Sequence, residues 1–315
     1  MTVTVVANPT SGSGRAARML PTVVAKVRAT FADHRIVVRR TTHYDHAKAI
    51  CQQAAADHGP EDVLIMVGGD GMMHLGLNAV AGTEVALGLI AAGSGDDLCR
   101  GLGIDVKHPD QSLTLMTEPP RPVDLIRIDT ADGDVRWVGS IVASGFDALV
   151  NARANAMTFP KGALQYPAAL FAELATFRPL HYAITVDGVR RELESMLIAI
   201  GNTTSFGGGI KMCPEADPTD GQLDLTVIHP VSRRLLLRMF PQIYTGTFVS
   251  LDEVELLRAT TVELDGSYAD GRPLQVMGDG EALATAPVTL TLVPGAAQVF
   301  RPDLRGNDLR GNGAQ

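Results

Sequence analysis

The order of apolar and polar positions divides the chain near residue 120. Before that point, short runs that are almost wholly apolar alternate with segments whose apolar residues recur at helical spacing. The runs expected to be strands are 3–8, 35–42, 62–67 and 85–93, and the segments expected to be helices are 15–32 and 45–59. Apolar strands separated by helices are typical of a parallel sheet that is covered on both faces. Residues 1–122 are therefore predicted to form an α/β domain.

After Pro122 the pattern changes to short alternating segments with turn residues between them. These segments are 123–129, 135–145, 181–188, 194–202, 223–230, 260–266, 274–281 and 288–295. Such spacing favours an antiparallel β-sandwich, predicted over 123–302, with its last segment able to return to the first domain. Helical insertions are expected near 152–178 and 232–248. The tail 303–315 repeats DLRGN and is predicted to be disordered.

Composition narrows the function classes. The 315 residues suffice for two cores, and 27 basic against 35 acidic residues give a net charge of −8. This balance argues against a general nucleic-acid binder and against loose adhesion to anionic lipid, although it leaves a local basic patch open. The three cysteines are far apart, so neither a disulfide framework nor a zinc site is expected.

Targeting signals are not evident in the sequence. The first apolar residues follow no basic leader, and no apolar run approaches the roughly 18 residues that a membrane span needs. We expect a cytoplasmic protein that can touch a membrane from outside.

Three glycine-bearing turns follow strands of the first domain. They are the loop Asn8–Gly14, the stretch Gly68–Met73 and the stretch 93–97, GSGDD. Ligands bind at the carboxyl ends of parallel strands, and glycine lets a phosphate approach main-chain N–H groups at a helix start. Each turn taken alone could equally be a tight structural turn, or in the first case a helix-capping loop.

Two nucleotide-binding motifs can be set aside. No G-x-x-x-x-G-K-[ST] occurs, which excludes a P-loop. The residues Gly12-x-Gly14-x-x-Ala17 weakly imitate a dinucleotide fingerprint, but the second strand ends in Arg39, Arg40, Thr41 and Thr42 and lacks the ribose-binding acid. A dinucleotide-dependent oxidoreductase is therefore the least favoured enzyme.

Carboxylates also follow glycines in the second domain. Asp217 and Asp220 precede Gly221 and could hold a hard cation with a main-chain carbonyl, or simply form an Asp-Gly hairpin turn. Later, GDGE places Asp279 and Glu281 around Gly280 at a strand end. A carboxylate there could accept a proton from an alcohol.

Taken together, the motifs resemble those of the diacylglycerol kinase catalytic-domain family, which includes sphingosine, ceramide and bacterial lipid kinases. The motifs are NPTSGSG, GGDGMMH, GSGDDLCRGLGI, PVDLIRI, GGGIKMCPEADPTDGQLDL and GDGE, in the family's order over about residues 1–300. GGDG alone is shared with NAD kinases and phosphofructokinase-like enzymes, whereas the later elements favour the lipid kinases.

The resemblance implies a fold, a reaction and a set of site residues. It implies an active site in the cleft between the domains, with ATP and Mg²⁺ as cofactors and transfer of the γ-phosphate to a lipid hydroxyl, most simply that of diacylglycerol. The implied nucleotide contacts are Asn8, Ser11, Gly12, Ser13, Gly14, Thr41, Gly68, Gly69, Asp70, Gly71, Met72, Met73, Ser94 and Gly95. The implied catalytic residues are Asp70, Asp97 and Asp124 around Mg²⁺, with Glu281 as general base, and a second cation site comprises Asp217, Asp220 and Gln222.

Two departures from the family pattern keep other functions open. Met72 replaces the threonine of GGDGT, and Ser94 and Asp96 replace the threonine and asparagine of G-T-x-N-D. The alternatives are an NAD-kinase-like kinase of a soluble substrate and a catalytically weak, nucleotide-binding regulatory homologue.

Two helical segments are candidates for contact with the lipid. The segment 152–177 is apolar with few charges, and 231–246 sets leucines beside Arg233, Arg234 and Arg238. Each could dock on a bilayer surface or pack its apolar face onto the sandwich. The expected partner is a membrane lipid met peripherally, with no nucleic acid, and a homodimer is left open.

Overall fold

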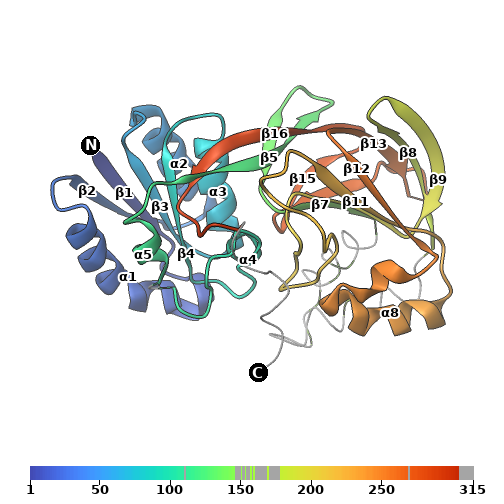
Figure 1. Cartoon of the computed structure of the whole chain (residues 1–315), viewed down its shortest axis with the longest axis horizontal. Helices are drawn as coiled ribbons and strands as arrows, with labels where there is room; N and C mark the ends of the chain where they lie inside the picture. Colours follow the sequence, from blue (N-terminus) through green and yellow to red (C-terminus); the bar gives the residue numbers. More distant parts are fainter. Residues whose placement is uncertain are drawn as a thin grey trace. The chain divides into compact units, whose positions relative to one another are not determined.

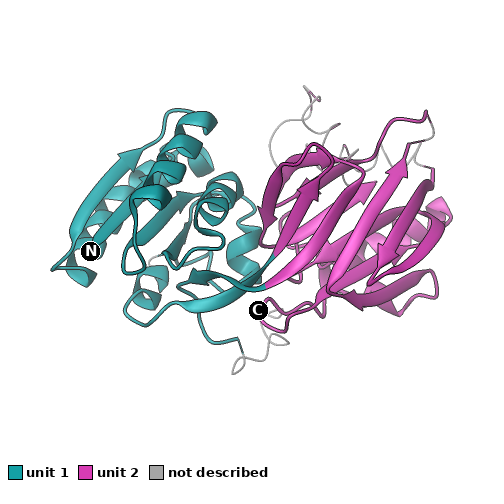
Figure 2. Cartoon of the chain, turned by 90° about the horizontal axis from the view of Figure 1, so that it is seen from above, with its two compact units in different colours: residues 1–125, 294–315 teal, residues 126–293 magenta. Residues whose placement is uncertain are grey.

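The computed structural model describes residues 1–109, 111–145, 178–268 and 270–304. It also describes Val150, Arg153, Met157, Phe159 and Ala169. The chain forms two compact units, one of residues 1–125 and 294–315 and the other of residues 126–293 (Figure 2).

The first unit is built on a parallel sheet with the strand order β2-β1-β3-β4 (Figure 1). Its strands are β1 (Thr2–Ala7), β2 (Arg35–Arg40), β3 (Val63–Gly68) and β4 (Ala86–Ala91). The last residues of β16 (Val288–Val299) extend the sheet, because Gln298 and Val299 pair in parallel with Ala86 and Leu87. The helices are α1 (Ser11–Thr30), α2 (Tyr44–Asp57), α3 (Asp70–Val80), α4 (Asp97–Gly101) and α5 (Gln111–Leu115).

Helices cover both faces of this sheet, as predicted from its apolar strands. Strand β3 is buried at every residue, and its alternate side chains point to opposite faces. Ile65 belongs to the core beneath α1 and α5, whereas Met66 contacts Cys51 of α2 on the other face. A strand buried on two sides has no polar face, which explains why the sequence shows an unbroken apolar run.

The strand order brings the three glycine turns together at the carboxyl ends of the parallel strands. The chain runs from β1 outward to β2 and then returns to the other side of β1 as β3, so the order reverses between β1 and β3. The turns after β1, β3 and β4 all leave the carboxyl ends of parallel neighbours. In open α/β sheets this reversal point is where ligands bind.

The second unit consists of two antiparallel sheets. One has the order β12-β11-β10-β7-β14-β15; in the other, β16 is followed by β13, β8 and β9, while β5 pairs with β16 and β6. The strands are β5 (Arg121–Thr130), β6 (Val135–Val138), β7 (Ile141–Gly145), β8 (Leu180–Val186), β9 (Val189–Ser195), β10 (Leu197–Gly201), β11 (Leu223–Ile228), β12 (Val254–Ala259), β13 (Thr261–Ser267), β14 (Gln275–Gly278) and β15 (Glu281–Thr285). Both sheets contribute to one apolar core, in which Ile198 and Leu290 are fully buried. The predicted sandwich is confirmed.

Three strands went unnoticed in the sequence, and each lies at an edge of its sheet. They are β9, β12 and β15. In β9, VRRELES, four of seven residues are charged, and in β12, VELLRA, Glu255 and Arg258 interrupt the apolar pattern. Edge strands carry charges because these discourage pairing with other chains, so their hydrophobic pattern is weak.

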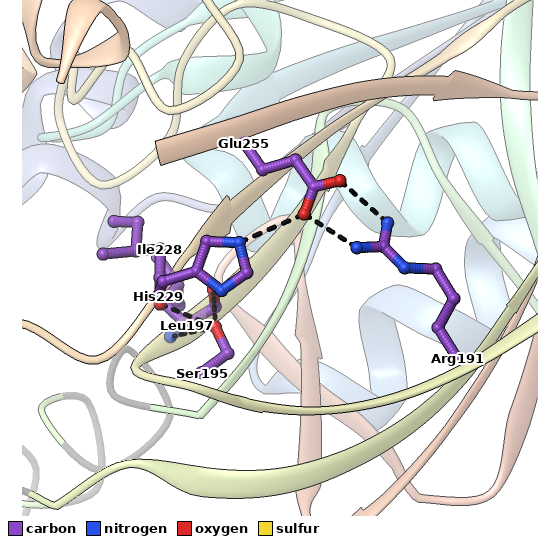
Figure 3. A network of polar contacts seen from close by, with 6 residues as sticks. All are labelled: Arg191, Ser195, Leu197, Ile228, His229 and Glu255. Atoms are coloured by element: carbon purple, nitrogen blue, oxygen red, sulfur yellow. Dashed lines mark hydrogen bonds and ion pairs between the residues drawn. The ribbon is translucent and has the colours of Figure 1, made fainter. Parts of the chain in front are cut away.

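A charged network joins two of these edge strands (Figure 3). Arg191 of β9 donates two hydrogen bonds, of 2.8 and 3.0 Å, to the two carboxylate oxygens of Glu255 on β12. The ring Nε2 of His229 lies 3.1 Å from Glu255 Oε2. The hydrogen bond from Arg191, followed by that from His229, lowers the pKa of Glu255. The network links the edges of the two sheets of the sandwich.

The second helical insertion is confirmed as α8 (Arg233–Thr245), followed by the short 3₁₀ helix η2 (Thr247–Ser250). The first insertion, near 152–178, lies almost wholly outside the described residues, as does the tail beyond Leu304. None of the described helices is long and apolar enough to cross a membrane.

Candidate active site

The three glycine turns of the first unit are in direct contact with one another. The N–H of Asn8 donates to Val67 O at 3.1 Å, and the N–H of Ala92 donates to Gly68 O at 2.7 Å. A Cβ atom added to Gly12 would lie 2.2 Å from Ala92 O, and one added to Gly93 would lie 2.5 Å from the Cα of Gly69. Glycine is required at these points because main chain of neighbouring turns occupies the space of a side chain.

The first turn is a shaped loop, not a simple helix cap. Gly12, Ser13 and Gly14 have φ values of 56°, 53° and 83°, so three successive residues are left-handed. Thr10, at the N-cap position, makes no side-chain capping hydrogen bond. Its N–H and hydroxyl instead donate to Oδ1 of Asn8, at 3.1 and 2.8 Å. Asn8 therefore shapes the start of the loop, which leads into α1.

The second and third turns are tied together by Asp70. Its Oδ2 accepts a hydrogen bond of 2.8 Å from the N–H of Asp96, and its Oδ1 accepts one of 2.6 Å from the N–H of Asp97. Asp96 is left-handed, with φ of 54°, and its own Oδ1 accepts the N–H of Gly93 at 2.9 Å. A Cβ atom at Gly95 would lie 2.7 Å from Asp70 Oδ2, which explains the glycine there.

This arrangement concentrates negative charge in a buried place. Asp96 and Asp97 expose only 3% and 9% of their surface. Burial, together with repulsion from Asp97, raises the pKa of Asp70 to about 6. Burial also raises the pKa of Asp96, opposed by the N–H of Gly93 and by the charge of Arg15. Clustered carboxylates that repel one another favour the binding of a cation.

The residues fit a nucleotide with Mg²⁺. Glycine turns that precede helices can offer main-chain N–H groups to phosphates, and carboxylate oxygens are the ligands that Mg²⁺ prefers. Within the described part of the chain, no group of three or more His, Cys, Asp and Glu side chains is placed to hold a metal alone.

In the second unit, the GDGE hairpin is held by its first carboxylate. Asp279 and Gly280 have φ values of 49° and 81°, as in the two-residue turn that joins twisted strands. Asp279 Oδ1 accepts the N–H of Ser140 at 2.9 Å and also its hydroxyl, and Oδ2 accepts the N–H of Gly139 at 3.1 Å. Glu281 begins β15, opposite Gly278, and is partly exposed.

The segment of Gly139 and Ser140, which is bonded to Asp279, also accepts hydrogen bonds from Asn202. The side-chain amide of Asn202 donates to Gly139 O at 2.9 Å, and the N–H of Asn202 donates to Ser140 O at 2.8 Å. Asp279 is 7% exposed and Asn202 is fully buried. The sequence named Asp279 only as a carboxylate beside Glu281 that could accept a proton, and it gave Asn202 no role.

Comparisons with known proteins agree with this geometry. The model of the diacylglycerol kinase catalytic domain matches residues 2–128, and that of the YegS C-terminal NAD kinase beta sandwich-like domain matches residues 140–301. A diacylglycerol kinase of Mycobacterium tuberculosis is 37% identical over 302 residues, covering 95% of each chain. The chain belongs to the diacylglycerol kinase family. It is a lipid kinase, and the recognition from six ordered motifs is confirmed.

More distant relatives extend the same picture. A Stenotrophomonas maltophilia protein named "Probable lipid kinase YegS-like" is 28% identical over 256 residues, covering 79% of this chain and 81% of its own. A crystal structure of a diacylglycerol kinase from Bacillus anthracis str. Sterne superposes with a TM-score of 0.70 at 19% identity, covering 96% of this chain and 97% of that one. The structural likeness bears on the fold alone.

Several residues expected to contact the nucleotide are buried. Met72 is 6% exposed and packs on Gly68, where an added Cβ would lie 2.6 Å from Met72 Cγ. Met73 is fully buried, and Thr41 is 6% exposed. The methionine that departs from the family's threonine thus points into the first unit, and a nucleotide contact from Met72 or Met73 would come from main chain.

Asp124 connects β5 to β16 by a hydrogen bond. It is 5% exposed, and its Oδ1 accepts the N–H of Gly295 at 2.8 Å. Its membership of the acidic network around Mg²⁺ stays a prediction.

The expected second cation site already contains a positive side chain. Asp217 Oδ1 accepts the N–H and hydroxyl of Thr219, at 3.0 and 2.7 Å, in a local turn. Asp220 bonds to the guanidinium of Arg258 and accepts the N–H of Gln222 at 2.9 Å. A metal at these residues would rely on main-chain carbonyls, and it stays a prediction.

A buried carboxylate beside this turn was missed. Asp224, two residues after Gln222, is 8% exposed and lies 3.5 Å from Arg258 Nε. Burial raises its pKa to about 6, although Arg258 opposes this shift. Asp224 lies within the apolar segment 223–230, so the sequence pattern did not single it out.

Proposed function

We propose that the protein transfers the γ-phosphate of ATP, with Mg²⁺, to the hydroxyl of diacylglycerol, yielding phosphatidic acid. The observation that carries this proposal is the contact of three glycine turns around Asp70 at the reversal point of the parallel sheet. The relative named as a diacylglycerol kinase, at 37% identity over 95% of the chain, supports the choice of lipid.

The glycine turns bind the triphosphate. Gly12, Gly69 and Gly93 bring their main chains together, so phosphate oxygens meet N–H groups without steric hindrance from side chains. Ser11, Ser13, Ser94 and Thr41 offer hydroxyls from the same turns and from the end of β2. Because phosphoryl transfer depends mainly on positioning and charge neutralisation, a rigid main-chain cradle is the principal contribution of the first unit.

Asp70 and Asp97 would hold Mg²⁺, directly or through water, with Asp124 as a further member of the acidic network. When bound, Mg²⁺ neutralises charge on the triphosphate and withdraws electron density from the transferred group. Asp70 has a second role, because its hydrogen bonds to the N–H groups of Asp96 and Asp97 fix the third turn. Binding and shaping are thus combined in one carboxylate.

Glu281 accepts the proton of the lipid hydroxyl. A partly exposed carboxylate at the start of β15 is accessible to substrate and can act as a general base. Asp279 is a positioning residue: it anchors the hairpin to Gly139 and Ser140, which limits the movement of Glu281.

The proposal is tested with purified protein, labelled ATP, Mg²⁺ and diacylglycerol in mixed micelles, with phosphatidic acid as the product measured. Parallel reactions contain a sphingoid base, and NAD as a soluble acceptor. We expect phosphatidic acid to form with diacylglycerol, to depend on Mg²⁺, and to be lost in Glu281→Gln.

If the sphingoid base is phosphorylated and no phosphatidic acid forms, the protein is a lipid kinase whose substrate is not diacylglycerol. If only NAD is phosphorylated, the acceptor is a soluble molecule and not a lipid. Full turnover by Glu281→Gln would remove Glu281 as the base.

A further inference from the structure

Helix α8 presents two different faces. Its inner face packs on the sandwich: Met239 is 2% exposed, and Leu235, Leu236 and Ile243 contact the core of the second unit. This packing accounts for one set of apolar residues in the helix. It leaves the outer face to be explained.

The outer face is also apolar along its middle. Leu237 and Tyr244, seven residues apart and therefore on the same side, expose 51% and 45% of their surface. The ring of Phe240 meets that of Tyr244 edge-on, with centroids 5.7 Å apart, and Pro241 is exposed beside them. Large apolar side chains that adjoin one another on a surface commonly mark an interaction site.

Arginines flank this apolar strip. Arg233, Arg234 and Arg238 are exposed, and the helix contains no acidic residue. Within the described part of the chain, none of the three forms an ion pair, whereas Arg190, Arg191 and Arg258 of the same unit all do. Three unpaired arginines together are conspicuous in a chain whose net charge is −8.

A further exposed aromatic side chain is that of Phe159, which exposes 84% of its surface. Met157, two residues before it, packs against Val150 and Ala169, as do Leu236 and Phe240 of α8. An aromatic ring this exposed loses free energy in water that it would regain in an apolar environment.

We propose that the outer face of α8 seats the protein on an anionic lipid bilayer. Leu237 and Tyr244 enter the boundary between headgroups and acyl chains, while the arginines extend to the phosphates of the headgroups. Charge complementarity decides the partner, because a cationic, apolar helix face matches a surface of anionic lipids. The inference rests on the proposed function insofar as the helix brings the enzyme to the membrane that holds its substrate.

The test measures co-sedimentation of the full-length protein with vesicles of phosphatidylcholine alone and of phosphatidylcholine with a quarter phosphatidylglycerol. The variant Leu237→Ser/Arg238→Glu alters the outer face of α8. The control Val189→Ser/Arg190→Glu makes the same kind of change in the β8–β9 hairpin, where Val189 is 65% exposed and the side chain of Arg190 71% exposed. Thermal melting verifies that both variants are folded.

We expect wild-type protein to bind the anionic vesicles, less at high salt, and the α8 variant to bind at least about tenfold more weakly. The control should bind like wild type. Absence of wild-type binding to anionic vesicles, or an equal loss in both variants, would overturn the proposal. So would sedimentation showing that wild type is a dimer and the α8 variant a monomer, because a second copy would then cover this face.

Vesicle binding requires no turnover, so this result is independent of the proposed reaction. If the protein binds vesicles but does not phosphorylate diacylglycerol, only the proposed substrate is wrong. Turnover of a water-dispersed short-chain diacylglycerol should be the same in wild type and in the α8 variant.

Discussion

Oδ1 of Asp70 lies 2.6 Å from the main-chain nitrogen of Asp97, a residue 27 positions later in the chain. The same carboxylate is repelled by the side chain of Asp97, and this repulsion adds to burial in raising the pKa of Asp70. The pair is thus held together by the main chain and pushed apart by its side-chain charges. The hydrogen bonds stabilise the fold, whereas the repulsion between the two carboxylates opposes folding and favours a bound cation.

Replacing Asp97 by Asn should separate activity from stability. The substitution removes a negative charge beside Asp70, so we expect the melting temperature to stay the same or rise while turnover falls by about 100-fold or more. Calorimetry and the phosphatidic acid assay measure the two quantities. The control Asp33→Asn removes the same charge from an exposed position in the same unit and should change neither. Wild-type turnover by Asp97→Asn would exclude this residue from catalysis.

Gly12→Ala should damage the first turn through a direct clash. The new Cβ would lie 2.2 Å from Ala92 O at a φ of 56°, so the turns after β1 and β4 must separate. We expect ATP affinity, measured by calorimetry, to fall at least about tenfold, because the cradle loses its shape. Gly82→Ala has a comparable φ of 74° but open space around the Cβ, and should cost only about 1 kcal/mol of stability. If both variants bind ATP with equal affinity, the contacting glycine turns do not form the phosphate-binding cradle.

Substitutions of the two carboxylates in the GDGE hairpin should differ in their effect on stability. Asp279→Ala leaves buried N–H groups of Gly139 and Ser140 without acceptors, and each such loss costs about 1–3 kcal/mol. We therefore expect a marked loss of unfolding free energy in Asp279→Ala, with turnover reduced as well. Glu281→Gln should unfold like wild type and yet lose turnover. Denaturant melts and the kinase assay distinguish the two, and an unchanged midpoint for Asp279→Ala would contradict its positioning role.

Glu255 should make the stability of the second unit depend on acid pH. Hydrogen bonds from Arg191 and His229 lower its pKa below the ordinary value of 4.5. A lowered carboxylate pKa stabilises the fold fully above about 4.5, and this contribution disappears as the pH falls through the folded-state value. We expect Glu255→Gln to lose about 1 kcal/mol of unfolding free energy at pH 7 and much less at a pH below the folded-state pKa of Glu255.

Urea melts at both pH values measure this difference. Glu194→Gln on the same edge strand as Arg191, with its carboxylate 56% exposed, is the control and should change little at either pH. If Glu255→Gln loses the same unfolding free energy at both pH values, the loss comes from packing and not from charge.

Local sequence identified the interior of both units but not their borders. The strands β3 and β4 are apolar at nearly every position because both faces are covered, and this pattern is unmistakable in the sequence. The edge strands β9 and β12 were missed because their charged residues obscure the alternation. The network of Arg191 and Glu255 accounts for two of those charges, and it becomes visible only when the sheets are assembled.

The glycine turns were recognised from sequence because glycine, aspartate and strand ends leave a clear local signal. Their mutual contacts, and the reason for glycine at Gly12, Gly69 and Gly93, depend on the strand order. Likewise, the sequence presented Asp279 only as a second carboxylate beside Glu281, with no sign of its positioning role. Its hydrogen bonds to Gly139 and Ser140 join segments 139 and 140 residues apart, a distance that no local pattern can span.

Local sequence was sufficient for the two kinds of architecture, the lipid kinase family and the stretches that carry its chemistry, because hydrophobic period and turn chemistry are local properties of the chain. The assembled fold was needed to show that Asp70 holds the turn of Asp96 and Asp97, that Met72 points into the core, and that Arg258 faces Asp220. Those outcomes depend on which strands become neighbours, since a side chain acquires its partner, its burial and its pKa from residues that are remote in sequence.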